Sequence, residues 1–93
     1  MLTPLPMDLD VVSDPAAEIL KQILASNLRA YRKERGISQL ALSIELGLDQ
    51  RYYSGIERGE WNLTFDTVGS IADKLGLHPL DLITGHEPPP EDE

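Results

Sequence analysis

The chain has 93 residues, a length that suits one small domain and does not fit a two-domain enzyme. It contains 16 acidic and 8 basic residues, for a net charge of −8, and 41% of its residues are hydrophobic, as in a soluble globular protein. The absence of cysteine excludes disulfides and Cys-based zinc sites. No apolar run approaches the roughly 18 residues of a membrane span, so we expect a cytoplasmic protein without membrane contact.

The charge is distributed unevenly along the chain. Residues 1–20 carry −4 and residues 77–93 carry −5, whereas residues 21–76 hold all eight basic residues and sum to +1. Charges are screened over about 10 Å at 0.1 M salt, so a local basic face matters more to a polyanion than the total charge. The overall acidity therefore argues only weakly against nucleic acid as a partner.

Composition also divides the chain into three parts. Residues 1–13 contain two prolines and no helical period, which predicts a flexible N-terminal arm. Residues 85–93 combine three prolines with acidic side chains, which predicts a disordered acidic tail. Residues 14–84 show helical periods and no strand pattern, so we expect an all-α domain between these ends.

A long first helix is predicted at the start of the domain. Asp14 is the expected N-cap, Pro15 occupies the first helical position, and Gly36 ends the helix. Basic residues in its last turns suit the negative end of the helix dipole. The apolar face of this helix comprises Ile19, Leu20, Ile23, Leu24, Leu28 and Tyr31.

Three shorter helices and a final helical turn should follow, giving five helical elements. Ser38 and Asp49 are the expected N-caps of the first two, and the third begins at Asn62 or Thr64. The predicted segments are residues 38–46, 49–58, 62–75 or 64–75, and 78–83. The apolar stripe of the third short helix comprises Phe65, Val68, Ile71, Ala72 and Leu75.

The first two short helices have the pattern of a helix-turn-helix. Gly47 permits the tight turn between them, and Ser43 is small where the helices should cross. In such a unit the second helix enters the major groove of DNA. The side chains expected to fix the crossing angle are Leu42, Leu46, Tyr53 and Ile56.

Specific residues make this stretch resemble a known family. The pattern Leu28-x-x-x-Arg32-x-x-x-Gly36-Ile37-Ser38-Gln39, followed by Tyr52-Tyr53-Ser54-Gly55-Ile56-Glu57-Arg58-Gly59, is similar to the Cro/C1-type (Xre-like) helix-turn-helix regulators of phages and bacteria. Within that family, Ser54 to Gly59 and the following Asn62-Leu63-Thr64 look most like the controller proteins of restriction-modification systems. The likeness covers about residues 24–83 and implies a five-helix, lambda-repressor-like DNA-binding domain with a lengthened first helix.

The resemblance implies which side chains read bases. Gln50 and Arg51 stand where family members contact base edges, and arginine and glutamine are favoured bidentate partners of guanine and adenine. Ser54, one turn further on, is a weaker candidate. Gly55 replaces a long base-reading residue of several phage repressors, so that contact is absent here.

The resemblance also implies a set of phosphate contacts. Gln39 and Ser38 would fasten the start of the second helix to the backbone, and Gln39 would also brace the recognition helix. Arg58 would hold a flanking phosphate. Tyr52 either packs or binds a phosphate, and Trp61 either covers the turn or contacts the sugar-phosphate backbone. The complete set of candidates is Ser38, Gln39, Tyr52, Arg58, Trp61, Asn62 and Thr64.

Other charged residues have structural interpretations. The family likeness pairs Arg32 with Glu57 as a partly buried salt bridge, and removing one partner would strand the other charge. Arg29, Lys33 and Arg35 could form a solvated helix end whose charge compensates the dipole. Glu60, like Trp61, replaces a basic residue common in this loop of the family.

Leu40 and Ile44 depart from the family pattern. They form an apolar i, i+4 pair on a helix face that is usually polar. We expect the first helix or the N-terminal arm to cover them.

These observations predict a sequence-specific, double-stranded DNA-binding transcription regulator that acts as a homodimer on a palindromic operator. The dimer contacts are expected in the C-terminal segment, with Ile19 and Ile23 of the first helix as rivals. No catalytic motif, metal site or cofactor site is predicted. The alternative is an antitoxin or adaptor whose acidic flanks bind a basic protein. The expected dimer residues are Leu77, Leu80, Leu82 and Ile83.

Overall fold

The computed structural model describes residues 15–85. That range is helical without any strand, so the prediction of an all-α domain is confirmed. The predicted N-terminal arm, the Asp14 cap and residues 86–93 of the acidic tail lie outside the described residues. The helices are α2 (Pro15–Arg35), α3 (Gln39–Leu46), α4 (Gln50–Glu57), α5 (Phe65–Leu75) and α6 (Leu80–Ile83).

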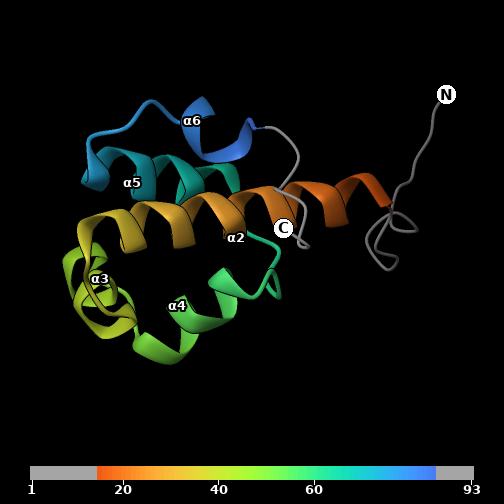
Figure 1. Ribbon diagram of the computed structural model, residues 1–93. Helices are drawn as coiled ribbons and strands as arrows, with labels where there is room; N and C mark the ends of the chain where they lie inside the picture. The colour runs from red at the N-terminus through yellow and green to blue at the C-terminus, as the bar shows by residue number, and fades with distance from the viewer. Residues whose placement is uncertain (1–14, 86–93) are drawn as a thin grey trace, which may run out of the picture.

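The long helix α2 is the centre of the arrangement. Figure 1 shows α3 and α4 on one side of α2, and α5 and α6 on the other. Helix α2 contacts both α4 and α6, while α3 contacts α4 and α5. The α3–α4 unit is therefore attached to a helix that spans most of the domain.

The helix boundaries follow from capping residues in the sequence. The side chains of Ser38, Asp49 and Thr64 accept hydrogen bonds from backbone N–H groups two or three residues further on, at 3.0 to 3.2 Å. Helix α5 thus begins after Thr64 and not after Asn62. Gly47 ends α3 with a φ of 71°, a left-handed conformation that favours glycine and turns the chain into α4.

The core forms where α2, α3, α4, α5 and α6 meet. The residues expected to fix the α3–α4 crossing are all buried, as is the small Ser43 between them. Lys74 of α5 adds a polar contact to α3, because its Nζ donates to the carbonyl of Leu46 at 3.1 Å. The buried apolar residues are Leu24, Ala25, Leu28, Leu42, Leu46, Tyr53, Ile56, Ile71, Ala72, Leu75 and Leu82.

For two apolar residues, the observed exposure is the opposite of the one expected. Phe65, predicted to join the buried stripe of α5, is 92% exposed because it is the first residue of the helix and lies beyond the core. Leu82, predicted as a dimer contact, is buried in the core. Asn27 of α2 explains this position, since its Nδ2 donates to the carbonyl of Leu82 at 2.7 Å and holds α6 against α2.

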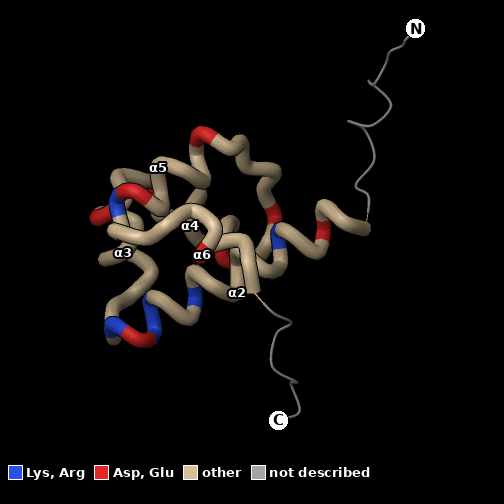
Figure 2. The backbone as a smooth tube through the Cα atoms, turned by 90° about the horizontal axis from the view of Figure 1, so that it is seen from above, with Lys and Arg blue, Asp and Glu red and all other residues tan. Residues whose placement is uncertain are grey.

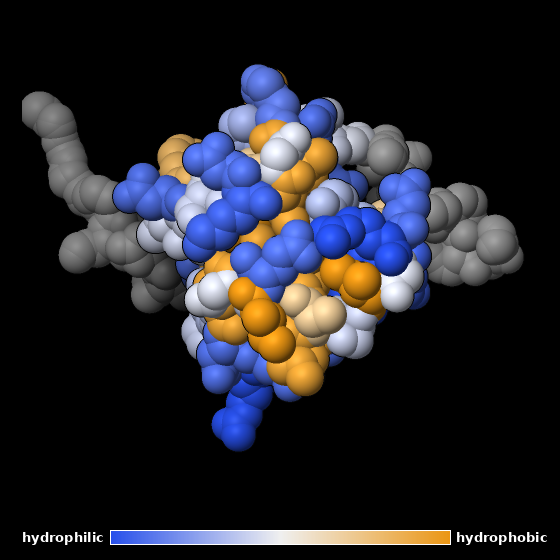
Figure 3. Space-filling view, turned by 90° about the vertical axis from the view of Figure 1, so that its left-hand side faces the viewer, coloured by the Kyte–Doolittle hydropathy of each residue, from blue (hydrophilic) through white to orange (hydrophobic). Residues whose placement is uncertain are grey.

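The expected cover over Leu40 and Ile44 is also not provided by α2. These side chains are 49% and 68% exposed, because α2 packs against α4 and α6 and leaves the outer face of α3 open. Figure 3 shows apolar surface between hydrophilic side chains on the side of the molecule where α3 lies. The prediction that the first helix covers this pair is wrong, and the arm lies outside the described residues.

Candidate nucleic-acid interface

Helix α4 separates polar and buried side chains clearly. Gln50 and Arg51 in its first turn are exposed, whereas Tyr53, Ile56 and Glu57 face the core. Within residues 15–85, the side chains of Gln50 and Arg51 make no hydrogen bond or ion pair. The helix therefore presents a free guanidinium and a free amide at its N-terminal end.

The position of α4 is fixed by the buried carboxylate of Glu57, which is only 2% exposed. Arg32 of α2 donates to it twice, from Nε at 2.7 Å and from Nη2 at 3.1 Å. Gln39 of α3 donates from Nε2 at 3.0 Å, and the Tyr53 hydroxyl also donates to this carboxylate. A charge that is buried with this many donors is satisfied and holds three helices together.

Burial and these hydrogen bonds shift the pKa values of Glu57 and Tyr53. Burial raises the pKa of Glu57, but the hydrogen bonds from Arg32, Tyr53 and Gln39 outweigh it, so that the pKa lies below its usual value. Burial, followed by the hydrogen bond to Glu57, raises the pKa of Tyr53 far above its usual range. The carboxylate is therefore ionised and the tyrosine protonated at neutral pH.

Gln39 connects α3 to α4 through both ends of its amide. Its Nε2 donates to Glu57, while its Oε1 accepts a hydrogen bond from the Ser54 hydroxyl at 2.8 Å. One amide N–H of Gln39 is left for a phosphate. Ser54 has already donated its single hydroxyl proton, so it is left only as an acceptor toward a base.

Arg29 has a role that the sequence did not reveal. Its Nη1 donates to the backbone carbonyl of Glu57 in the last turn of α4, where a cation also interacts favourably with the helix dipole. Arg35 binds Glu45 at 2.9 Å and lies over the ring of Tyr31. The interpretation as a solvated helix end is wrong for Arg29, which is partly buried against α4, whereas Lys33 and Arg35 are exposed as expected.

Trp61 covers the far end of α4. Its ring packs edge-on against Tyr52, with 5.2 Å between the ring centroids. A Cβ atom on Gly55 would lie 2.4 Å from the indole Nε1, so only glycine leaves room for the indole in this position. The indole thus occupies the space next to the position where several phage repressors have a base-reading side chain.

The remaining candidates lie in and around the helix ends. Arg58 forms an exposed ion pair with Glu60, with 2.7 Å between Nε and Oε2. The hydroxyls of Ser38 and Thr64 serve as N-caps, and the Thr64 hydroxyl also donates to Thr67 Oγ1 at 3.1 Å. Asn62 is exposed.

Charged residues of both signs are distributed over the described part of the chain. Figure 2 shows basic residues concentrated toward the C-terminal end of α2, where the last turn contains Arg32, Lys33 and Arg35. The described residues contain no group of three or more side chains suited to holding a metal ion. None of the described helices is long and apolar enough to cross a membrane.

A helix-turn-helix whose second helix is firmly anchored and exposes polar side chains defines a DNA-binding regulator. The comparison with protein families agrees, because the helix-turn-helix model HTH_3 matches residues 28–82. The chain belongs to this family of Cro/C1-type helix-turn-helix proteins. It is a transcription regulator and not an enzyme.

Several relatives are similar to this chain in sequence. A hypothetical transcription factor of Neisseria meningitidis serogroup B is 35% identical over 69 residues, which is 74% of this chain and 65% of the relative. Control protein C.SmaI of Serratia marcescens is 37% identical over 70% of this chain and 77% of its own length. Control protein C.BamHI of Bacillus amyloliquefaciens is 32% identical over 69% and 80%.

Two crystal structures resemble the fold. The hypothetical transcription factor NHTF from Neisseria matches with a TM-score of 0.67 and 32% identity, over 87% of this chain and 88% of that chain. The restriction-modification controller protein C.AhdI from Aeromonas hydrophila matches with a TM-score of 0.60 and 33% identity, over 71% and 97%. The lambda-repressor-like fold expected from the sequence is thus consistent with solved helix-turn-helix regulators.

We expect Glu57→Gln to destabilise the fold by about 3 kcal/mol at pH 7, because it leaves the Arg32 charge without its partner. Since the pKa of Glu57 is lowered on folding, its charge stabilises the native state above the unfolded pKa of about 4.3. This contribution is lost as the pH falls through the lower folded pKa. Urea unfolding followed by circular dichroism should therefore show a gap between the two proteins that narrows at low pH. Glu45→Gln, which removes an exposed ion pair, is the control; a gap that does not change with pH would contradict this assignment.

We expect Gly55→Ala to displace the Trp61 ring, because the added Cβ atom overlaps the indole. The emission of Trp61, the single tryptophan of the chain, should shift to longer wavelength as the ring becomes more exposed. Gly69→Ala in α5 is a matched control, since nothing lies within 4 Å of its added Cβ. It should leave the emission unchanged and stabilise the fold by up to about 1 kcal/mol through helix propensity. Identical spectra for both variants would refute the close contact.

Proposed function

We propose that this chain is a sequence-specific regulator that binds double-stranded DNA through α4 and acts as a homodimer on a palindromic operator. The observation that carries the proposal is the combination of two free side chains, Gln50 and Arg51, on a helix anchored from behind by Glu57. Free donors on a rigid element are what base recognition requires, since a loosely held helix would lose hydrogen-bond geometry.

The base-reading roles follow from the chemistry of the exposed side chains. Arg51 can donate two hydrogen bonds to the O6 and N7 atoms of a guanine, and Gln50 can pair with the N6 and N7 atoms of an adenine. Ser54 accepts from an amino group of a base, because its proton is donated to Gln39. Two strong readers and one acceptor per protomer recognise only a few base pairs.

Phosphate contacts would fix the register of α4 on the duplex. Ser38 still has a hydroxyl proton to donate, and Gln39 keeps one amide N–H. The Tyr52 hydroxyl has no partner among residues 15–85, although its ring packs on Trp61. Thr64 would contribute its backbone N–H, because its hydroxyl is used by the cap. The further proposed contacts are Arg58, Asn62 and the indole of Trp61.

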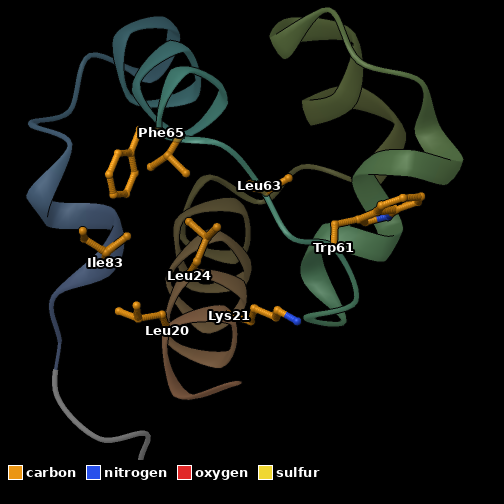
Figure 4. A pocket seen from close by; sticks show the side chains of 8 residues that line it. Leu20, Lys21, Leu24, Trp61, Leu63, Phe65 and Ile83 are labelled. Atoms are coloured by element: carbon orange, nitrogen blue, oxygen red, sulfur yellow. The ribbon is translucent and has the colours of Figure 1, made fainter. Parts of the chain in front are cut away.

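A second copy of the chain would supply the recognition helix that reads the second half-site. Specific recognition by one short helix generally needs two half-sites one helical turn apart. Figure 4 shows Leu20 and Leu24 of α2, Phe65 of α5 and Ile83 of α6 directed toward a common apolar hollow, whereas Trp61 lies to one side near α4. We assign this apolar face to the dimer contact, together with the exposed Leu80 of α6.

This assignment modifies the residues expected from the sequence. Leu80 and Ile83 remain among the proposed dimer residues. Leu77, also expected there, is half-buried at the edge of the core. Leu82 is removed because it is buried within the protomer. Phe65 is added on account of its exposure, and Ile19 is exposed beside Leu20.

Relatives support the regulatory class more than the alternative. Several of the similar proteins are named control proteins, and one similar structure is titled a restriction-modification controller protein. We therefore place this chain among controller-like regulators. The antitoxin or adaptor function depended on the acidic flanks, most of which lie outside the described residues, and no feature of residues 15–85 favours it.

We expect Arg51→Ala to weaken binding to the preferred duplex by about 1 to 3 kcal/mol while barely changing binding to random DNA. The duplex would come from selection among random sequences with the purified protein, and fluorescence anisotropy would measure both affinities. Lys33→Ala removes the same charge from an exposed helix end and should change neither affinity strongly. An equal loss on both kinds of DNA would make Arg51 a phosphate contact.

We expect Phe65→Glu to convert the dimer into monomers, because a carboxylate would be buried in the apolar contact. The variant should still fold, since the side chain is exposed in the protomer and an acidic residue suits the first turn of α5. Sedimentation equilibrium would measure the mass, with Ile44→Glu on the outer face of α3 as the control. A dimer that survives Phe65→Glu but not Ile44→Glu would place the contact on α3.

A further inference from the structure

The loop after α4 contains an ion pair with unusual consequences for DNA binding. Arg58 donates from Nε to Glu60 Oε2 at 2.7 Å and from Nη2 to Oε1 at 3.2 Å. The carboxylate thus engages one whole edge of the guanidinium. Arginine binds phosphate through the same bidentate geometry. Glu60 therefore occupies donors that Arg58 would otherwise offer to the DNA backbone.

The loop holds Glu60 beside Arg58. The backbone N–H of Glu60 donates to the carbonyl of Gly55 at 3.0 Å. Gly59 has a φ of 73° and lies so close to α2 that an added Cβ would be 2.4 Å from Gln22 Nε2. The carboxylate itself lies over α4, with Oε1 3.3 Å from the position of a Cβ on Gly55. Its negative charge thus lies next to the last turn of α4, in an ion pair whose two side chains are exposed.

We propose that Glu60 competes with DNA phosphate for Arg58 and so lowers the affinity that the loop after α4 contributes. The inference rests on the proposed function, in which Arg58 contacts a flanking phosphate. On binding, Arg58 either exchanges the carboxylate for a phosphate or retains both. In the first case an existing ion pair is lost, and in the second the carboxylate repels the phosphate. The carboxylate opposes binding in both cases.

Glu60→Gln in the full chain tests this directly. The neutral amide should tighten binding about fivefold on both the selected duplex and random DNA, since phosphates are present in every sequence. The slope of log K against log salt should become steeper by up to about 0.9, because Arg58 would then neutralise its phosphate without a neighbouring carboxylate that offsets its charge. Glu45→Gln is the matched control, because it makes the same charge change in another exposed Arg–Glu pair, Arg35–Glu45. Its affinity should remain within about twofold of the unmodified protein.

A second comparison tests the route through Arg58. In an Arg58→Gln background, Glu60→Gln should lose most of its effect, because the guanidinium for which it competes is gone. If Glu60→Gln binds no more tightly than Glu45→Gln, the competition is refuted while the proposed function stands. Weaker binding to the selected duplex alone would refute it in favour of base reading by Glu60, since a carboxylate accepts from the N4 amino group of cytosine. Failure of the unmodified protein to prefer any duplex would overturn the proposed function together with this inference.

Discussion

The buried carboxylate of Glu57 is the constraint on which the arrangement of the helices depends. It receives donors from α2, α3 and α4 itself, through Arg32, Gln39 and Tyr53. A buried charge that lacks a partner is costly, so alternative packings of these three helices are strongly disfavoured. Arg29 adds a bond to the backbone carbonyl of the same residue. The exposed first turn of α4 is thereby held at a defined angle to the rest of the domain without using any of its own polar side chains.

Local chemistry in the sequence was sufficient to predict where the helices begin and end. Caps such as Ser38 and Asp49, and glycines such as Gly47, act within a few residues, so their effect can be read along the chain. Exposure depends on distant segments and was predicted less well. The apolar period of α5 continues to Phe65, but the core ends before it. Leu82 is buried because Asn27, 55 residues earlier, binds its carbonyl, and no local pattern encodes such a pair.

In the candidate interface, too, local spacing predicts some features and misses the contacts between distant residues. The exposed positions of Gln50 and Arg51 follow from helical spacing after the Asp49 cap. Spacing could not show that the Ser54 hydroxyl donates to Gln39, because the two residues lie on different helices, although the resemblance implied that Gln39 braces the recognition helix. Nor could it show that Trp61 lies against Gly55, which makes the glycine and the indole a matched pair. The first contact leaves Ser54 only as an acceptor, and the second places the indole directly against Gly55 of α4.

The ion pairs bear on how an acidic chain would recognise a polyanion selectively, as the proposed function requires. In the described part of the chain, Arg32, Arg35 and Arg58 are each paired with a glutamate, so their charges contribute little to a long-range field. Arg51 has no such partner within that range and lies at the start of the recognition helix. In the proposed function, a weak general attraction combined with a directional base reader at the start of α4 would favour discrimination over raw affinity, because non-specific binding depends on the sequence-independent attraction to phosphates. The lower affinity of each protomer for DNA would be compensated when the recognition helices of two protomers bind the same duplex.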